Sequence, residues 1–167
     1  MTTYRIAEDQ GQRVELYPHR SEKWISCAQP LVEQMRSFMR NIVARDVMIK
    51  DVHTITGDRK VAYARLMMLR HNVGALPVVD DENVVLGIIT QRDIDLAGAD
   101  VSDLLVSDLM TRSLIKAKET TTLRWIVERM IKTGLQRIPV LDENSRLLGL
   151  VTQTTVIKAA LMFNLLK

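Results

Sequence analysis

The sequence repeats itself: residues 46–94 align with residues 108–156 without a gap after a shift of 62 positions. Ten aligned positions are identical, whereas unrelated segments of this length share roughly three by chance at ordinary residue usage. The identical pairs include Asp46/Asp108, Met48/Met110, Met68/Met130, Pro77/Pro139, Asp80/Asp142, Gly87/Gly149 and Thr90/Thr152. A unit of about 50 residues buries too little surface to fold alone. The repeat therefore predicts two similar units that pack together about a pseudo-twofold axis.

Each copy predicts a short extended stretch followed by a helix. The extended stretches are expected at 52–55 and 114–117. The helical spacing of apolar residues is carried by Val61, Ala64, Met68 and Leu69 in the first copy and by Leu123, Ile126, Val127, Met130 and Ile131 in the second. Asn72 and Gly134 stand just after these helices, and both residue types tolerate the left-handed conformation that ends many helices. The helices are therefore expected to end there.

A β-hairpin and a second helix are predicted after the first helix of each copy. Two apolar runs flank the polar turns at 80–83 and 142–145, and this arrangement is typical of a hairpin. A final helix is expected to begin after Thr90 in the first copy and after Thr152 in the second. The order of elements is β-α-β-β-α in both copies.

These patterns predict an α/β (α+β) fold with three segments. The two repeats occupy residues 46–107 and 108–167, and an N-terminal extension occupies residues 1–45. The extension contains a helical pattern from about Leu31, and Pro30 suits a first helical position. A dimer contact is one expected role of this helix. No fold is predicted for the residues before Pro30.

Composition and charge exclude several classes of protein. The chain of 167 residues has a net charge of +3, contains no Lys/Arg tract and is only 4% aromatic, which argues against nucleic-acid binding. Cys27 is the only cysteine, so an intrachain disulfide and a Cys-rich zinc site are excluded. No apolar run approaches the ~20 residues of a membrane span, and the first residues lack a secretory pattern. We expect a cytoplasmic protein without a membrane or metal site.

The repeated motifs resemble those of a tandem pair of cystathionine-β-synthase (CBS) domains, also called a Bateman module. The resemblance covers residues 46–157 and rests on Asp46-Val-Met, 73–80 and 86–94 in the first copy, and on Asp108-Leu-Met, 135–142 and 148–156 in the second. It implies two CBS repeats that form a regulatory module without catalytic activity. It also implies that clefts between the repeats bind an adenosyl ligand such as AMP, ADP, ATP, NAD or S-adenosylmethionine.

The T-x-x-D motif of this family is intact once, as Thr90-Gln91-Arg92-Asp93. In the family the Thr lies near phosphate or ribose and the Asp binds the ribose hydroxyls. The second copy has Thr155 in place of the acidic residue, so the resemblance implies one strong site and one weak site. A second interpretation stays open, because Thr-x-x-Asp also fits a capping box that only satisfies the start of a helix.

The resemblance implies further ligand-binding residues. Arg137 occupies a position where the family often has a basic residue for phosphate, and a guanidinium can bond two phosphate oxygens. The alternative is an exposed Arg at the start of a strand. The implied set of ligand-binding residues is completed by Thr54, His53, Ala75, Pro77, Ile138 and Thr152.

Two functions follow, and neither is enzymatic, because the sequence contains no nucleophile, general-base or metal constellation. The first is a homodimeric sensor whose ligand shifts the relative orientation of the repeats, which a partner enzyme or transporter detects. The second is a constitutive dimerisation or scaffold module with empty clefts. The homodimer is expected from apolar helix faces that contain Leu123, Val127, Met130, Val156 and Ala160.

Overall fold

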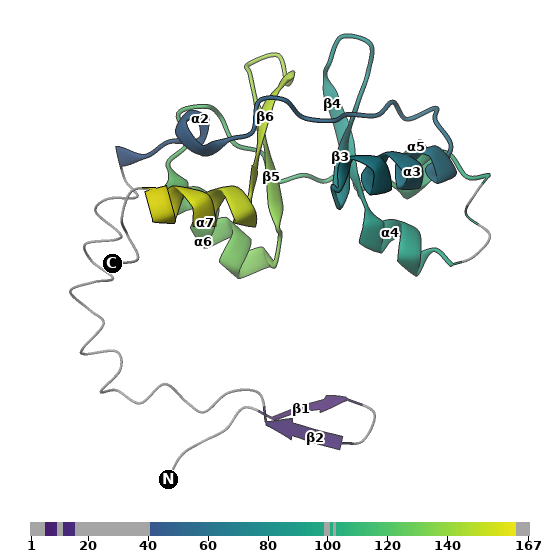
Figure 1. The fold of residues 1–167 in the computed structure, drawn as a ribbon, viewed down its shortest axis with the longest axis horizontal. Helices are drawn as coiled ribbons and strands as arrows, with labels where there is room; N and C mark the ends of the chain where they lie inside the picture. Colours follow the sequence, from purple (N-terminus) through teal and green to yellow (C-terminus); the bar gives the residue numbers. More distant parts are fainter. Residues whose placement is uncertain (1–5, 10–11, 16–40, 99–100, 102, 163–167) are drawn as a thin grey trace. The chain divides into compact units, whose positions relative to one another are not determined.

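The computed structural model (Figure 1) consists of two units, Met1–Phe38 and Met39–Lys167. The structure describes residues 6–9, 12–15, 41–98, 101 and 103–162. In the first unit, strands β1 (Ile6–Asp9) and β2 (Gln12–Glu15) form an antiparallel hairpin, in a region to which the sequence pattern assigned no fold. The helix expected from Leu31 lies outside the described residues.

The first repeat follows the predicted order. Helix α3 (Val61–His71) precedes strands β3 (Ala75–Val79) and β4 (Val85–Thr90), and helix α4 (Gln91–Leu96) follows directly. The two strands pair antiparallel, with Ala75 opposite Thr90. This hairpin places the start of β3 beside the junction between β4 and α4.

The second repeat has the same arrangement. It contains helix α6 (Leu123–Thr133), strands β5 (Arg137–Leu141) and β6 (Leu147–Thr152), and helix α7 (Gln153–Met162). Strands β5 and β6 pair antiparallel, and Arg137 stands opposite Thr152. The predicted fold class is confirmed, and so is the order helix, strand, strand, helix within each repeat.

The two stretches expected as first strands differ from the prediction. Each makes only a single parallel bridge, Ile55 with Val78 and Ala117 with Val140. The Ile55 N–H donates to the carbonyl of Pro77 at 3.1 Å, and Val79 N–H donates to the Ile55 carbonyl at 2.9 Å. Because each extended stretch forms a β-bridge with its hairpin at one residue, the sheets remain two-stranded.

Local sequence features explain where the helices and hairpins end. Helices α3 and α6 stop at Asn72 (φ 52°) and Gly134 (φ 72°), both in the predicted left-handed conformation. In the first hairpin, the Asp80 carboxylate accepts the backbone N–H groups of Glu82 (3.0 Å) and Val84 (2.8 Å). Its counterpart in the second hairpin, Asp142, accepts two backbone N–H groups in the same way. The repeated Asp therefore fixes the turn in both copies.

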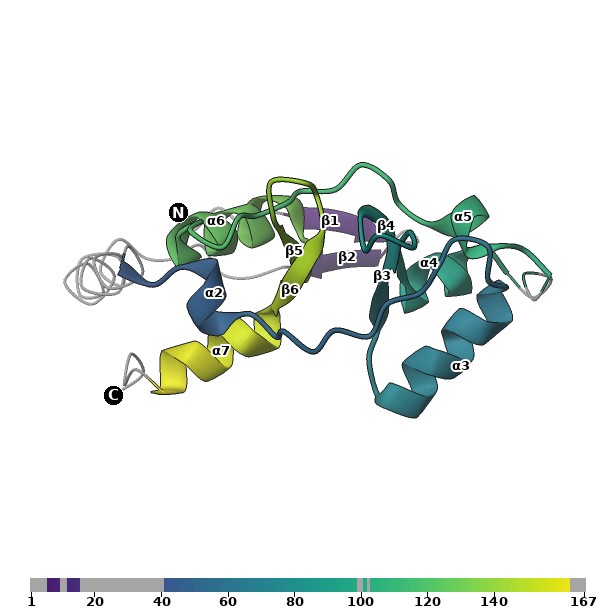
Figure 2. The same cartoon turned by 90° about the horizontal axis from the view of Figure 1, so that it is seen from above.

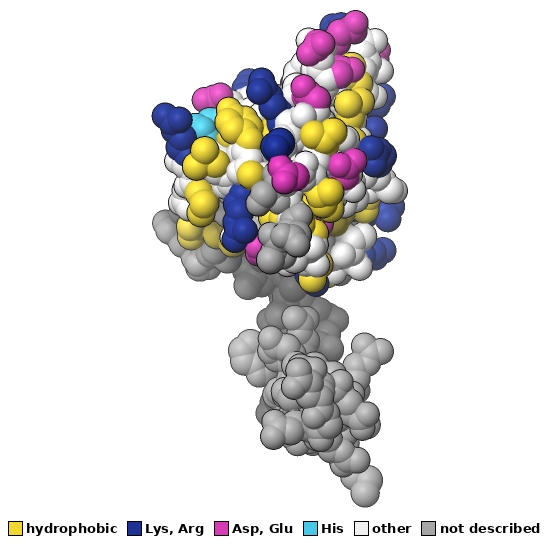
Figure 3. All heavy atoms as spheres, turned by 90° about the vertical axis from the view of Figure 1, so that its right-hand side faces the viewer, with side chains coloured by type: hydrophobic (Ala, Val, Ile, Leu, Met, Phe, Trp, Pro, Cys, Tyr) yellow, Lys and Arg dark blue, Asp and Glu magenta, His cyan; other side chains and the backbone are white. Residues whose placement is uncertain are grey.

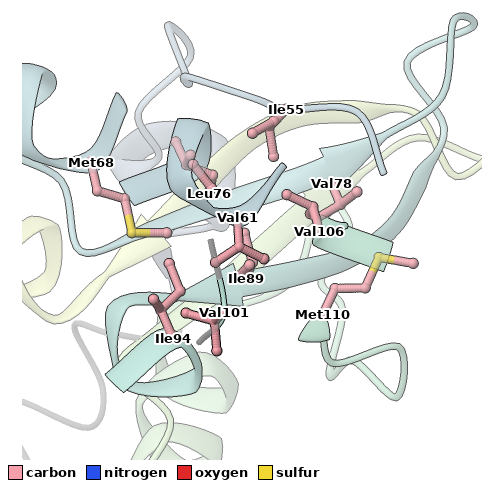
Figure 4. Close-up of a cluster of buried hydrophobic side chains, with 11 residues drawn as sticks. Ile55, Val61, Met68, Leu76, Val78, Ile89, Ile94, Val101, Val106 and Met110 are labelled. Carbon is pink, nitrogen blue, oxygen red and sulfur yellow. The ribbon is translucent and has the colours of Figure 1, made fainter. Parts of the chain in front are cut away.

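The segments that lead into the repeats exchange places. Helix α2 (Ala44–Val47) lies across the start of the first repeat but packs in the core of the second, and helix α5 (Val106–Leu109) lies across the start of the second repeat but packs in the core of the first. Figure 2 shows α2 beside α7, and Figure 4 shows Val106 and Met110 among the buried residues of the first repeat. Each core is therefore completed by the segment that leads into the other repeat.

This exchange explains why methionine and glycine recur at fixed positions in both copies. A Cβ atom on Gly87 would lie 2.8 Å from Met110 Sδ and 2.9 Å from the Thr111 carbonyl oxygen. A Cβ atom on Gly149 would lie 2.7 Å both from Met48 Sδ and from a carbonyl oxygen of the crossing segment. Only glycine allows the crossing backbone to approach each hairpin this closely.

The tips of the two hairpins hold the repeats against one another. Val79, Val85 and Leu141 form a small buried cluster between them. The Val85 N–H donates to the Ser145 carbonyl at 3.0 Å, and the Leu147 N–H donates to the Asn83 carbonyl at 3.0 Å. The repeats therefore share both apolar and backbone contacts at one end of their hairpins.

The surface differs from the prediction made for the helix faces. Leu123 and Met130 are buried inside the second repeat, so they cannot supply a dimer contact. Leu69, which belongs to the apolar helical pattern of the first copy, is 69% exposed. Figure 3 shows the side of the second unit that carries the first repeat, where hydrophobic side chains alternate with charged ones. Every helix of the described residues is too short or too polar to traverse a bilayer.

Candidate functional site

Two clefts are formed by equivalent segments of the two repeats. Cleft A, about 500 Å³, is lined by residues of the β4–α4 junction, of the segment 111–115 and of the segment 133–139. Cleft B, about 310 Å³, is lined by residues of the β6–α7 junction and of the segments 49–53 and 72–75. The shift of 62 residues relates the three segments of one cleft to those of the other. Both clefts draw on both repeats, as the pseudo-twofold arrangement predicts.

A third hollow of about 580 Å³ lies beside Trp125. All of its lining residues lie between Lys116 and Ser145, so it belongs to the second repeat alone. It contains none of the residues implied to bind a ligand, and clefts A and B are therefore the candidate sites.

The T-x-x-D motif forms one wall of cleft A. The Thr90 N–H donates to Asp93 Oδ2 at 2.8 Å, the Thr90 hydroxyl lies 2.7 Å from the same oxygen, and the Asp93 N–H donates to Thr90 Oγ1 at 3.2 Å. The pair is thus a complete capping box at the start of α4. Within the described part of the chain, Asp93 Oδ1 makes no hydrogen bond, so capping uses only one of the two carboxylate oxygens.

Arg137 stands at the first position of β5 and lines both clefts. Its Nη1 donates to Gln136 Oε1 at 3.4 Å, and no carboxylate of the described residues lies within 4.0 Å. Partial burial lowers the pKa of Arg137, but a guanidinium stays charged at neutral pH. The side chain therefore presents a partly desolvated cation that pairs with no carboxylate of the described residues.

Cleft B has the same helix start but different chemistry. The Thr152 N–H donates to Thr155 Oγ1 at 3.0 Å, and the Thr155 N–H donates to Thr152 Oγ1 at 3.1 Å. Two hydroxyls thus cap the start of α7, where a hydroxyl and a carboxylate cap α4, and of these two threonines Thr152 lines cleft B. The His53 ring stacks on His71 at the edge of the cleft, with 3.8 Å between ring centroids. Asp51 contributes the carboxylate of this cleft.

The implied ligand-binding residues are divided among three places. Thr90 and Asp93 line cleft A, whereas His53, Ala75 and Thr152 line cleft B. Arg137 lines both. The remaining three, Thr54, Pro77 and Ile138, line neither cleft, and the side chains of Pro77 and Ile138 are fully buried.

Several residues of cleft A were missed by the sequence analysis. Ser113, Arg92 and Pro139 line it. A shift of 62 residues from the predicted Pro77 leads directly to Pro139, so the internal repeat contained the signal. Among the described residues, no three His, Cys, Asp or Glu side chains come together as metal ligands.

The family of CBS domains matches the chain twice, at residues 44–99 and 106–161. Among curated proteins, inosine-5'-monophosphate dehydrogenase from Methanocaldococcus jannaschii is 33% identical over 126 residues. The aligned region covers 75% of this chain but 25% of that protein, so the chain spans about a quarter of its relative's length.

Two solved structures share the fold. The CBS domain pair of protein MJ0100, in complex with 5'-methylthioadenosine and S-adenosyl-L-methionine, has a TM-score of 0.66 and 28% identity, and the match covers 71% of this chain and 94% of that one. The structure of CBSX2 in complex with AMP has a TM-score of 0.68 and 25% identity, and the match covers 74% and 99%. These matches confirm the resemblance that the repeated motifs predicted.

Proposed function

Because the chain belongs to the CBS domain family, we propose that it is a non-catalytic regulatory module that binds an adenosyl ligand in cleft A. One observation carries this proposal. Cleft A brings the intact T-x-x-D motif of the first repeat together with Arg137 of the second repeat in one cavity. These residues are 44 or more positions apart in the sequence, and neither helix capping nor strand formation requires them to meet.

The chemistry of cleft A suits the parts of an adenosine nucleotide. Asp93 has a carboxylate oxygen left over from capping, and a carboxylate can accept hydrogen bonds from both ribose hydroxyls. Arg137, with Arg92 at the same cleft, supplies positive charge for phosphate. Apolar side chains, including Ile88 and Ile115, offer a surface for the adenine base.

The solved relatives support this ligand class. The CBS pair CBSX2 is in complex with AMP, and the CBS pair of MJ0100 is in complex with 5'-methylthioadenosine and S-adenosyl-L-methionine. A ligand that contacts both repeats stabilises one relative orientation of them, and a partner enzyme or transporter then responds to that orientation. The cavity volume of about 500 Å³ is in the range of small-molecule sites.

A nucleotide panel tests the proposal by thermal unfolding of the full chain. AMP, ADP, ATP, NAD and S-adenosylmethionine are each added at millimolar concentration. At 100 times its dissociation constant, a bound ligand adds about 2.7 kcal/mol to the free energy of unfolding. At least one member of the panel is expected to raise the melting temperature.

The second candidate is a constitutive scaffold with empty clefts. The complete capping box of Thr90 and Asp93 favours it, because this box gives both side chains a structural role without any ligand. A melting temperature that no ligand changes would support the scaffold and contradict the sensor.

We also infer a homodimer in solution. Its support is the exposure of apolar side chains on two helices, with Leu66 58% exposed on α3 and Leu161 58% exposed on α7. Association would remove such side chains from water. Light scattering at tens of micromolar protein is expected to give twice the chain mass of 19.0 kDa. A monomer mass would contradict this inference without affecting the ligand proposal.

A further inference from the structure

Clefts A and B share one wall, formed by Gly74, Gln136 and Arg137. A Cβ atom on Gly74 would lie 2.8 Å from Arg137 Nη2, which is closer than real Cβ contacts. The missing side chain at Gly74 therefore leaves room for the guanidinium to lie in the wall itself. From this position it is accessible from both cavities.

Arg137 is the cation that the two clefts have in common. Cleft A contains Arg92 and Asp93 besides it, whereas cleft B contains Asp51 and His53. The equivalent position in the first repeat is Ala75, so no second arginine enters cleft B from that strand. Because no described carboxylate pairs with Arg137, an incoming anion meets no competitor for it among the described residues.

We propose that Arg137 is a single phosphate-binding group that serves both clefts, so that a phosphate held in one cleft excludes a phosphate from the other. This inference rests on the proposed function and names how its site is regulated. The guanidinium fork matches one phosphate group in a bidentate manner. A second phosphate would lose that pairing and would also face the negative charge of the first.

The proposal assigns different ligand classes to the two clefts. Cleft A retains Arg92 and Asp93 and takes the nucleotide phosphate first. Once Arg137 is engaged there, the fixed anion of cleft B is Asp51, which repels a second phosphate. Cleft B then favours an adenosyl ligand without phosphate. By linkage, each phosphate weakens the binding of the other to the same degree.

Isoleucine methyl NMR of the full chain can read the two clefts separately. Ile88 and Ile115 line cleft A, and Ile49 lines cleft B. AMP and adenosine are titrated in separate experiments. The measured quantity is the phosphate gain, defined at each cleft as the dissociation constant of adenosine divided by that of AMP.

In the wild type, the phosphate gain is expected to be at least about tenfold in cleft A. It is expected to be absent in cleft B while AMP fills cleft A. Asp93→Ala, which weakens cleft A, is expected to release Arg137 and to restore a gain of about fivefold or more at Ile49. This change in cleft B from a substitution in cleft A is the signature of a shared cation.

Arg137→Gln is expected to abolish the phosphate gain in both clefts, whether or not it is combined with Asp93→Ala. The matched control is Arg92→Gln, which removes the same charge from a residue that lines cleft A alone. It is expected to lower the gain only at Ile88 and Ile115. If Arg137→Gln does not fold, Arg137→Lys replaces it, and a reduced gain in both clefts is expected because lysine lacks the fork.

Three results would overturn the proposal. The first is a phosphate gain in cleft A that is unchanged in both Arg137 variants, and the second is a phosphate gain in cleft B that is the same whether cleft A is filled with AMP or weakened by Asp93→Ala. The third is an Ile49 signal that responds to neither AMP nor adenosine. Failure of AMP and adenosine to bind either cleft would instead contradict the proposed function. The two failures are therefore distinguishable.

Discussion

Clefts A and B have the same backbone framework and differ in the side chains at two of its key positions. The position of Asp93 in the first repeat is Thr155 in the second, and the strand position of Arg137 in the second repeat is Ala75 in the first. Both helix starts are nevertheless capped, one by a carboxylate and the other by a hydroxyl at 3.0 Å. A hydroxyl is thus sufficient for the cap, so the carboxylate at Asp93 exceeds what the fold requires.

The largest expected effect distinguishes capping from ligand binding. Asp93→Ala should lower AMP affinity at least tenfold, because hydrogen bonds to a charged acceptor contribute about 1.5–3 kcal/mol each. Thr155→Ala is the matched control, since it removes an equivalent cap in cleft B. Calorimetric titration measures affinity, and melting curves measure stability.

Both substitutions should cost about 1 kcal/mol of stability through the lost cap. Only Asp93→Ala should weaken the tight site. Unchanged AMP affinity in a folded Asp93→Ala protein, or two equally tight sites in the wild type, would show that the carboxylate is only a cap.

The second prediction compares the two glycines, Gly87 and Gly149, at which the exchanged segments approach the hairpins. Gly149→Ala and Gly87→Ala should each destabilise the protein by about 1–3 kcal/mol, because the added methyl group meets a carbonyl oxygen at 2.7 Å or 2.9 Å. Gly149→Ala should cost at least as much as Gly87→Ala. Urea unfolding measures both.

Gly57→Ala is the control for these substitutions, because its nearest neighbour, the Cβ of Ser107, lies at 3.4 Å. Its stability should change much less. If all three variants were equally stable, the exchanged segments would not be held against the hairpins as closely as the structure indicates.

The third prediction removes the difference between the clefts. Thr155→Asp restores the acidic residue of the T-x-x-D motif in the second repeat. The carboxylate can accept the Thr152 N–H in place of the hydroxyl and can also bind ribose, so adenosine should bind cleft B about tenfold more tightly. The Ile49 methyl signal reports this affinity. An unchanged adenosine affinity of cleft B in Thr155→Asp would indicate that the shape of the cleft, rather than the missing carboxylate, limits binding.

The smallest expected effect concerns the first helix of each repeat. Helix α6 is capped by the Thr122 hydroxyl, whereas α3 begins after Lys60 without a side-chain cap. Lys60 instead donates to Asp103 at 2.7 Å, and this hydrogen bond, together with the lysine charge, lowers the pKa of Asp103. Because both side chains are exposed, Asp103→Asn should change the melting temperature by less than about 3 °C at neutral pH.

The pH dependence of this effect has a definite sign. A lowered carboxyl pKa stabilises the folded protein above the unfolded value of about 3.9, and this stabilisation is lost as the pH falls through the lower folded value. The difference between wild type and Asp103→Asn should therefore shrink below about pH 4. Melting curves from pH 7 to pH 3 test this, and a difference that grows on acidification would contradict it.

Features that depend on neighbouring residues were accessible from the sequence. The helical spacing predicted α6, and Asn72 and Gly134 predicted the helix ends. The Thr90–Asp93 spacing indicated a capping box, which the structure confirms. Helix periodicity, turn chemistry and capping act over a few residues, so each leaves a local pattern.

The shared wall of the clefts has no such local pattern. Arg137 was expected at one ligand phosphate, but its access to cleft B depends on how the chain places Gly74 beside it. Pro77 and Ile138 follow the same motifs, yet the strands turn their side chains into the core. A strand alternates its faces, and only its packing decides which face becomes a cleft.

The sequence by itself determined two repeats, their helix-strand-strand-helix order and the difference between Asp93 and Thr155. Only the tertiary structure decided that α2 and α5 exchange repeats and that Arg137 lies between two clefts. The physical reason is the distance along the chain. Met48 reaches Gly149 across 101 residues, and a contact of that span depends on the path of the whole backbone rather than on any local preference.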